Sequence, residues 1–183
     1  LDIYPSMCGI AGIISSNPDI LSFTRLKKMA AVLAHRGPDG EGYWINQSQT
    51  VGFAHRRLSV IDLSDAAAQP MHYSPEEAAD LTHRYTITYN GEIYNHPVIK
   101  TQLLSAGYHF RTQSDTEVVL AAYDYYKEDC LQYFDGMFAF AIWDERKQTL
   151  FAARDRFGEK PFFYLFDEVN RSFLFASEMK ALW

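Results

Sequence analysis

Gly9-Ile10-Ala11-Gly12-Ile13-Ile14 is an apolar run that is followed at once by the turn-forming residues Ser15-Ser16-Asn17-Pro18. A short apolar run between turn signals is typical of a buried strand rather than of a helix. Similar short runs recur along the chain and predict further strands at 43–45, 51–55, 85–89, 137–143, 149–153, 162–166 and 172–176. Polar turns separate the last of these strands, so we expect antiparallel meanders.

Three segments have helical periodicity. Apolar residues recur at helical spacing from Phe23 to Leu33, and Ser114-Asp115-Thr116-Glu117 has the pattern of a capping box that begins a second helix. Another helix is expected over 97–105. The chain stops inside what we interpret as a helix beginning near Ser177, which indicates a larger protein cut at a domain boundary. Early strands, central helices and late hairpins favour an α+β fold, with sheets packed on each other and helices outside.

The composition is that of one acidic globular domain. The 183 residues include 17 Lys and Arg against 23 Asp and Glu, a net charge of −6, and 48% are hydrophobic. No cluster of Lys and Arg supplies the positive field that attracts nucleic acids and anionic membranes, so we expect neither as a partner. No apolar run approaches the roughly 20 residues of a membrane helix, and the N-terminus lacks a signal-peptide pattern. The expected location is the cytoplasm.

Only two cysteines occur, Cys8 and Cys130, which form neither a disulfide framework nor a metal-ligand spacing. Cys8 has two interpretations. Beside Gly9 and Ile10 it can be a small buried apolar residue. If the Met7–Cys8 bond is cleaved, the same residue carries a thiol and a free α-amine, whose ordinary pKa of about 7.7–8.0 suits a general base. Nucleophile and base are then one residue.

Asn90-Gly91-Glu92 follows the strand predicted at 85–89 and also has two interpretations. Asn-Gly is a strong signal for a hairpin turn. Alternatively, the Asn90 side-chain amide and the Gly91 backbone N–H form an oxyanion hole with two donors.

Arg57 and Asp115 are candidates for contacts with a substrate. Arg57 is by default a solvated arginine at a strand edge, but its guanidinium fork also suits a carboxylate. Asp115 is most simply a residue of the first helical turn, and it could equally hold an ammonium group. His35 and His55 are interpreted as hydrogen-bonded structural groups rather than as general acids.

Six motifs, in order, resemble the glutaminase domain of glutamine-dependent asparagine synthetases. The resemblance runs from Met7 to the end of the chain, and the ordered set is far more specific than any one motif. The motifs are Met7-Cys8-Gly9-Ile10-Ala11-Gly12, His35-Arg36-Gly37-Pro38-Asp39-Gly40, His55-Arg56-Arg57-Leu58-Ser59, Tyr89-Asn90-Gly91-Glu92-Ile93-Tyr94-Asn95, Ser114-Asp115-Thr116-Glu117 and Arg154-Asp155-Arg156-Phe157-Gly158.

The resemblance implies a class II glutamine amidotransferase with the N-terminal-nucleophile (Ntn) fold, an αββα sandwich of two antiparallel sheets between helix layers. It implies that Cys8 attacks the side-chain amide of glutamine and forms a thioester that water cleaves. Asn90 and the Gly91 N–H then stabilise the oxyanion, and Arg57, Glu92 and Asp115 hold the amino-acid end. For Glu92, an exposed turn carboxylate is the alternative.

The resemblance assigns residues 8–183 to the glutaminase domain, which requires no metal or other cofactor. ATP and magnesium are expected only in a C-terminal synthetase domain that this chain lacks, because it has no Ser-Gly-Gly-x-Asp-Ser pyrophosphate loop. That domain and glutamine are the expected partners, and a homodimer is left open. Arg154, Asp155 and Arg156 are interpreted as structural or as facing the synthetase domain.

The seven residues before Cys8 depart from the family pattern, which needs the cysteine at the mature N-terminus. We interpret residues 1–7 as a tag scar or propeptide with the start Met7, and the intact chain as a precursor with little glutaminase activity. A non-catalytic module that docks on a synthetase is the alternative function. An amidotransferase that supplies ammonia to a sugar or phosphoribosyl acceptor fits the chemistry but not the sequence of residues 89–95.

Overall fold

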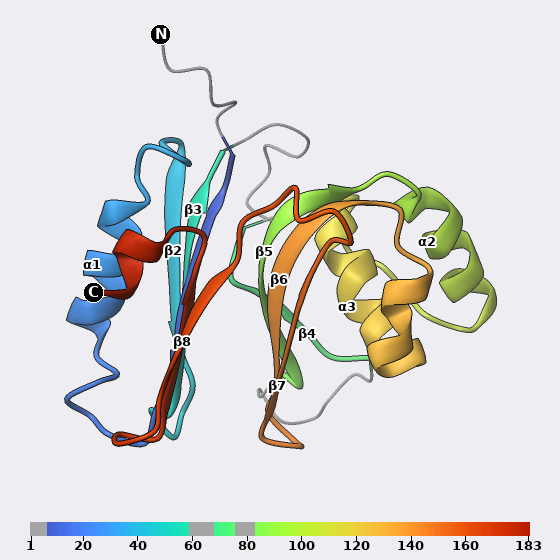
Figure 1. Ribbon diagram of the computed structural model, residues 1–183. Helices are drawn as coiled ribbons and strands as arrows, with labels where there is room; N and C mark the ends of the chain where they lie inside the picture. Colours follow the sequence, from blue (N-terminus) through green and yellow to red (C-terminus); the bar gives the residue numbers. More distant parts are fainter. Residues whose placement is uncertain (1–6, 59–67, 76–82) are drawn as a thin grey trace, which may run out of the picture.

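The computed structural model describes residues 7–58, 68–75 and 83–183. Residues Leu1–Ser6 of the expected N-terminal extension and Ser59 of the third motif lie outside this range. Two antiparallel sheets face each other (Figure 1). The first has the order β2-β3-β1-β9-β8, with β1 Gly9–Ile14, β2 Gly40–Ile45, β3 Val51–Arg57, β8 Phe163–Asp167 and β9 Ser172–Ala176. The second has the order β4-β5-β6-β7, with β4 Met71–Tyr73, β5 Tyr85–Ile93, β6 Gly136–Asp144 and β7 Thr149–Arg154.

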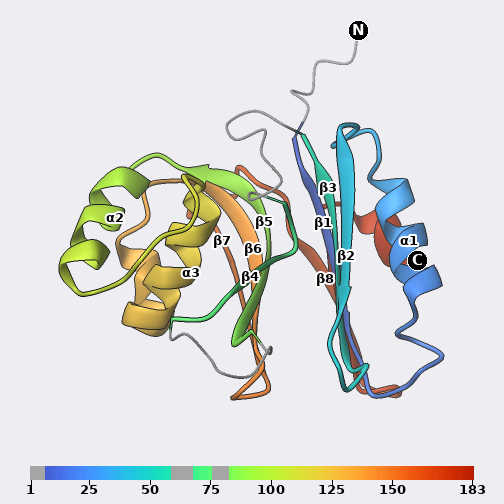
Figure 2. The same ribbon diagram turned by 180° about the vertical axis from the view of Figure 1, so that it is seen from behind.

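Helices cover the outer face of each sheet. Helix α1 (Phe23–Val32) and the short 3-10 helix η3 (Met179–Leu182) lie on the five-stranded sheet, whereas α2 (His96–Ser105), α3 (Asp115–Tyr126) and the 3-10 helix η2 (Lys127–Gln132) lie on the four-stranded sheet. Figures 1 and 2 show the same four layers from opposite sides. The α+β class and the αββα sandwich predicted from the sequence are confirmed.

Alternation along the strands divides the apolar side chains among three layers of core. In β1, Ala11 and Ile13 pack beneath α1, whereas Ile10 points into the space between the sheets. There Ile10 belongs to a cluster with Phe53, Phe175 and the small residues of β6. Successive side chains of a strand point to opposite faces, so residues of even number in β1 face the second sheet.

The helices begin close to where the sequence predicts, but one cap differs. Ser22 accepts the N–H of Arg25 at 3.2 Å and caps α1, and Ser114 accepts the N–H of Thr116 at 3.2 Å and caps α3. The capping box predicted at Ser114 is only half formed. Glu117 accepts backbone N–H groups of the preceding loop instead, from Arg111 at 2.9 Å and from Thr112 at 2.7 Å. The carboxylate therefore fastens the loop before α3.

Other differences reflect tertiary pairing. Strand β5 does not turn at Asn90-Gly91 but continues to Ile93, because β6 pairs with it as far as Gly136 opposite Ile93. Of the two interpretations of Asn90-Gly91, the hairpin turn is therefore wrong. The helix expected from Ser177 is only the four-residue η3. Strand β4 and helix η2 are too short to give a periodic pattern and were not predicted.

Within the described parts of the chain, no helix combines the length and the apolar character needed to cross a membrane.

Candidate active site

Cys8 lies just before β1, at the end of the five-stranded sheet where β3 finishes. Its sulfur is held by one residue: the Leu58 N–H lies 3.3 Å from Sγ, and Sγ lies 3.6 Å from the Leu58 carbonyl oxygen. The residue as a whole is partly exposed. Cys8 is therefore a held thiol on a partly exposed residue, unlike the fully buried Cys130.

Opposing influences act on the thiol. Burial raises the pKa of Cys8, and it is the largest of them. The hydrogen bond from the Leu58 backbone lowers that pKa, as do the positive charges of Lys160, Arg57 and Arg36. The net pKa is raised, so the thiol needs a base to become the thiolate that attacks carbonyl groups.

Arg36 fixes the backbone of Cys8 and was given no role from the sequence. Its Nε donates to the Cys8 carbonyl oxygen at 3.2 Å, and its Nη1 pairs with Glu178 at 3.1 Å. The same Glu178 oxygen accepts from His35 at 2.8 Å, which gives His35 the structural role predicted for it. The sequence signal for this position is the glycine that follows Arg36 in the second motif. A Cβ on Gly37 would overlap the Arg56 carbonyl group, so only glycine allows the chain beside Arg36 to approach β3 this closely.

Asn90 lies on β5 of the other sheet and is 2% exposed. Its neighbour Tyr89 packs in the core under the helices, so by alternation the Asn90 side chain points toward the five-stranded sheet. No described residue accepts a hydrogen bond from Asn90 Nδ2. Buried polar groups almost always have a partner, so Asn90 Nδ2 is a donor that a ligand could satisfy. Asn90 thus presents a free donor in the space between the sheets.

Hydrogen bonds between the sheets bring this donor toward Cys8. His55 of β3 pairs with Ile10 in β1, two residues after Cys8, and its Nε2 donates to the Tyr89 carbonyl oxygen at 3.1 Å. Thr88 Oγ1 donates to the Ala54 carbonyl oxygen at 3.3 Å. His55 is buried, and burial lowers its pKa to about 4, so the neutral imidazole is a structural link rather than an acid. This agrees with the structural role predicted for it.

Gly91 is required by packing and not by a turn. It lies opposite Phe138 in β6, and a Cβ at this position would be 2.6 Å from the Phe138 Cα and would overlap the Met137 carbonyl oxygen. A side chain at residue 91 would push β5 and β6 apart. The glycine thus keeps the backbone beside Asn90 in place.

The remaining predicted residues are distributed around these groups. Arg57 ends β3 and its charge reaches the Cys8 thiol. Glu92 is half-buried on β5, on the same face as Asn90. Asp115 lies at the start of α3, on the helix side of β5, where Oδ2 accepts from the Tyr89 hydroxyl at 2.6 Å and from the Ile93 N–H at 3.0 Å. The structure thus brings Cys8 and Arg57 together and joins Asp115 to β5 rather than to Cys8.

The segment after β7 contributes structural contacts and one residue that sequence reasoning missed. The Asp155 carboxylate accepts the N–H groups of Phe138 at 3.3 Å and of Lys160 at 2.9 Å. Arg154 donates to the Gly158 carbonyl, and Arg156 donates to the Phe134 carbonyl at 3.1 Å. Arg154, Asp155 and Arg156 thus have contacts within the domain that fit the structural interpretation, and the alternative that they face a synthetase domain stays a prediction. Lys160 is buried near Cys8, and no sequence pattern separates it from a surface lysine.

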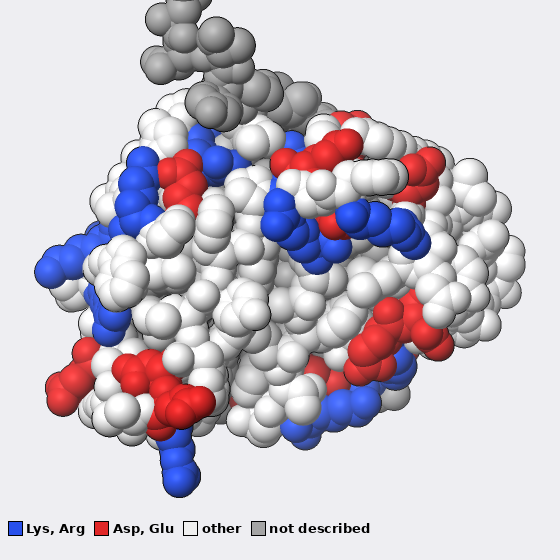
Figure 3. All heavy atoms as spheres, in the orientation of Figure 1, with Lys and Arg blue, Asp and Glu red and all other residues white. Residues whose placement is uncertain are grey.

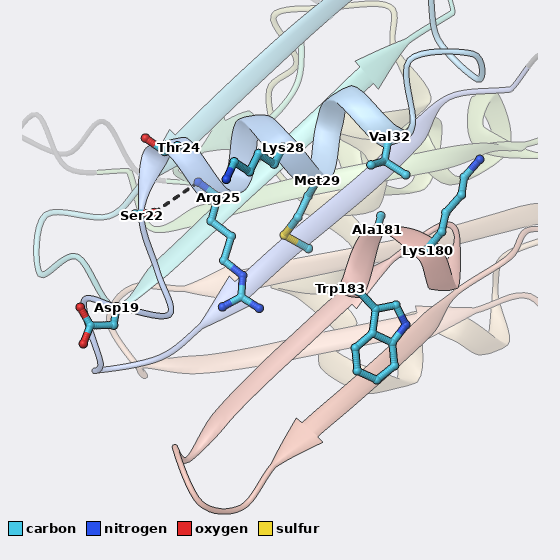
Figure 4. A pocket seen from close by; sticks show the side chains of 10 residues that line it. All are labelled: Asp19, Ser22, Thr24, Arg25, Lys28, Met29, Val32, Lys180, Ala181 and Trp183. Carbon is cyan, nitrogen blue, oxygen red and sulfur yellow. Dashed lines mark hydrogen bonds between the residues drawn. The ribbon is translucent and has the colours of Figure 1, made fainter.

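A separate pocket of about 340 Å³ lies between α1 and η3, away from this site (Figure 4). Arg25, Lys28 and Lys180 line it together with Met29 and Trp183. It is large enough for a small ligand, but it contains no cysteine and none of the residues predicted for catalysis. Within the described residues, no group of three or more His, Cys, Asp or Glu is arranged to hold a metal ion.

Charged side chains of both signs are interspersed on the face shown in Figure 3. On that face, and within the described residues, the blue Lys and Arg side chains alternate with red Asp and Glu side chains and do not form one large basic surface.

Comparisons of the sequence and of the fold with known proteins lead to the same family. Residues 7–183 match the family model described as a glutamine amidotransferase domain. The fold is similar to that of glutamine phosphoribosylpyrophosphate amidotransferase from B. subtilis in complex with ADP and GMP, with a TM-score of 0.70 over 95% of this chain and 42% of that one. Their sequence identity is 20%, so this likeness concerns the fold alone. The chain belongs to the glutamine amidotransferase domain family, as its motifs predict.

Relatives at higher identity narrow the family. The chain is 41% identical to asparagine synthetase [glutamine-hydrolyzing] 1 of Bacillus subtilis (strain 168), over 96% of its own length and 26% of the relative. It is 36% identical to amidase chry2 of Gibberella zeae, over 96% of its length and 26% of the relative. The chain is a glutaminase domain of the kind found in glutamine-hydrolysing asparagine synthetases, and it spans about a quarter of the length of these relatives.

Proposed function

We propose that this domain hydrolyses the side-chain amide of glutamine at Cys8 and supplies the ammonia to an ATP-dependent asparagine synthetase domain. The observation that carries the proposal is a thiol on a partly exposed residue at the end of one sheet and a buried amide donor without a described partner on the facing sheet. The Cys8 thiol provides the nucleophile, and Asn90 Nδ2 provides a donor for the charge that develops when a carbonyl group is attacked.

The reaction proceeds in two halves. The free α-amine of Cys8 takes the thiol proton, and the thiolate attacks the side-chain carbonyl carbon of glutamine. Asn90 Nδ2 and the Gly91 N–H donate to the oxyanion of the tetrahedral intermediate. The intermediate expels ammonia, which receives the proton from the α-ammonium, and leaves a γ-glutamyl thioester. Water then cleaves the thioester, releases glutamate and restores the thiol.

The amino-acid end of glutamine binds through charge. Arg57 pairs with the α-carboxylate, because its guanidinium donates two parallel hydrogen bonds to a carboxylate. Asp115 and Glu92 contact the α-ammonium. The Asp115 carboxylate is held in place, because Oδ2 accepts from the Tyr89 hydroxyl and from the Ile93 N–H. These contacts orient the substrate and do not take part in proton transfer.

The bond between Met7 and Cys8 decides whether this chemistry can run. While it is intact, the Cys8 nitrogen is an amide, which does not accept a proton at neutral pH. The Cys8 thiol, whose pKa burial raises, then has no adjacent base. Removal of residues 1–7 would supply the amine on which the proposed chemistry depends.

The acceptor of the ammonia lies outside this chain. The relatives are about four times longer and are named as asparagine synthetases. We assign ATP and magnesium to the remainder of such a protein and no cofactor to this domain, because thiol and amine chemistry releases ammonia without one. The whole protein is expected in the cytoplasm, with a homodimer as an assembly to be tested.

Glutamate release from glutamine by a chain that begins at Cys8 tests the hydrolysis. We expect turnover in the wild type, loss of turnover in Cys8→Ala, and retained glutamine binding in that variant by calorimetry. Cys130→Ala is the matched control, because Cys130 is buried in another part of the fold and should leave turnover unchanged. Unchanged release by Cys8→Ala contradicts the assignment of the nucleophile.

A further inference from the structure

Lys160 is a buried lysine that the hydrolysis described above does not use. It is 6% exposed, and its Nζ lies 2.8 Å from the Met7 sulfur, beside the residue that would have to leave. A thioether is a weak hydrogen-bond acceptor. Within the described residues, no carboxylate lies within ion-pair distance of Nζ. Burying an ammonium group without an anionic partner is costly, so its position requires an explanation.

The other cations near Cys8 are engaged elsewhere. Arg36 pairs with Glu178 and donates to the Cys8 carbonyl oxygen. Arg57 has partners of its own. Among the three cations that act on the thiol, Lys160 has the largest influence. Lys160 is thus the cation near Cys8 for which a thiolate would be the first close anionic partner.

The backbone at Lys160 is fixed so that this cation stays near the thiol. Asp155 Oδ2 accepts both the Lys160 N–H and the Phe138 N–H, and the Asp155 N–H donates to the Phe138 carbonyl oxygen at 2.8 Å. Phe138 lies in β6 opposite Gly91. The loop that carries Lys160 is therefore tied to the strand pair that carries Asn90.

We propose that Lys160 is a positioning residue whose ammonium group, buried beside Cys8, stabilises the thiolate form of Cys8. The inference deepens the proposed function, because it rests on Cys8 being the nucleophile. When Met7 is removed, Nζ loses its thioether partner, and the Cys8 thiolate is an anion whose charge acts on it together with those of Glu159 and Asp155. Proton transfer from the thiol to the α-amine is then favoured by the charge of Lys160.

The surrounding charges define what a pH measurement reports. Arg36, Arg57 and Lys160 lower the pKa of the Cys8 thiol. Burial is the main cause that lowers the pKa of Lys160, Arg36 lowers it further, and Cys8, Glu159 and Asp155 raise it. Cys8 also acts on the buried Tyr89 hydroxyl. Replacing Lys160 removes one of these charges and leaves the others in place.

The test is the rate of Cys8 alkylation by iodoacetamide between pH 5.5 and 9.5, followed by peptide mass spectrometry on the chain that begins at Cys8. An opposite charge at close range shifts a pKa by about one unit or more. We expect Lys160→Met to raise the midpoint by about one unit and to slow alkylation at pH 7 roughly three- to tenfold, because a more basic thiolate is partly compensated by its greater nucleophilicity. Lys160→Arg, which keeps the charge, should remain within about twofold of the wild type.

Controls separate this effect from a loss of structure. Lys100 lies on α2, on the outer face of the four-stranded sheet, and donates to the Thr112 carbonyl and to Gln113. Lys100→Met should therefore leave the alkylation profile unchanged. If Lys160→Met does not fold, Lys160→Gln is measured in the same way. An alkylation profile of Lys160→Met or Lys160→Gln that matches the wild type overturns the proposal. Because alkylation needs no glutamine, a raised midpoint in a chain that fails to hydrolyse glutamine would refute the proposed function and support this inference.

Discussion

The five-stranded and the four-stranded sheets contribute opposite kinds of groups to the site. At the end of the five-stranded sheet, Cys8 is held at two points: its sulfur by Leu58 and its carbonyl oxygen by Arg36. On the four-stranded sheet, Asn90 keeps a buried donor for which no described residue is an acceptor. In the proposed reaction, the nucleophile is thus fixed by contacts that exist before any substrate binds. The proposed oxyanion donor is fixed by the sheet and left free for charge that would form only during the reaction.

The two sheets are also joined by hydrogen bonds between their facing strands. Hydrogen bonds from His55 to Tyr89 and from Thr88 to Ala54 join them close to the site. A substitution in either sheet can therefore act on catalysis, on stability or on the link between the sheets. Variants that separate these three effects test whether the division of roles is real.

The largest effect is expected from Asn90→Ala. Loss of one oxyanion donor typically lowers kcat by about 100- to 1,000-fold. Stability should change little, because the lost Nδ2 has no described partner. Steady-state kinetics and urea unfolding of the chain that begins at Cys8 measure both quantities.

Asn46 is the matched control on the other sheet. It is buried as well, but its Oδ1 accepts the N–H groups of Thr50 at 2.8 Å and of Val51 at 2.9 Å. Asn46→Ala should lower the free energy of unfolding by about 1–3 kcal/mol and leave kcat unchanged. A kcat for Asn90→Ala close to that of the wild type would show that Asn90 is not an oxyanion donor.

The link between the sheets should make stability depend on pH through His55. Burial lowers the pKa of His55 in the folded chain to about 4, whereas an unfolded histidine has a pKa near 6.5. Between these values the unfolded chain binds a proton that the folded chain does not. The free energy of unfolding should therefore fall as the pH falls from 6.5 to 4, by up to about 3 kcal/mol.

Urea unfolding of the wild type and of His55→Gln across this pH range measures the effect. The variant lacks the titrating group, so its free energy of unfolding should fall less steeply over the same interval. Equal slopes for the two proteins would show that His55 is not buried as a neutral group.

Glycine at residue 91 should be needed for stability more than glycine at residue 40. Gly91→Ala places a methyl group against the β6 backbone and should lower the free energy of unfolding by about 1–3 kcal/mol. A Cβ on Gly40 would meet its nearest atom, Arg57 Cβ, at an ordinary 3.7 Å. Gly40→Ala should leave stability unchanged or raise it by up to about 1 kcal/mol. Thermal unfolding distinguishes the two, and equal stability for both variants would contradict the close packing at Gly91.

Strand and helix positions could be predicted from the sequence because they depend on local periodicity. Strands β1 and β9 have the bounds that were predicted. The course of β5 past Asn90 could not be predicted, because Asn-Gly favours a turn locally and only the pairing with β6 overrides it. Likewise, Glu117 fits a capping box in sequence but bonds to a loop whose position depends on the whole fold.

The site was predictable where its residues belong to distinctive motifs and unpredictable where burial alone makes them important. Cys8, Asn90 and Gly91 stand in motifs that indicate chemistry. Arg36 lies in a quoted motif, but its contact with the Cys8 carbonyl depends on the approach of the Gly37 backbone to β3. Lys160 becomes notable only when it is seen to be buried near the thiol.

The central claim is that Cys8 acts as nucleophile and base together once its α-amine is free. Glutamate release should be measured on two preparations of this chain, one beginning at Met7 and one at Cys8, with the first residue of each confirmed by intact mass. We predict turnover only in the preparation that begins at Cys8. Equal turnover by the preparation that retains Met7 would contradict the account.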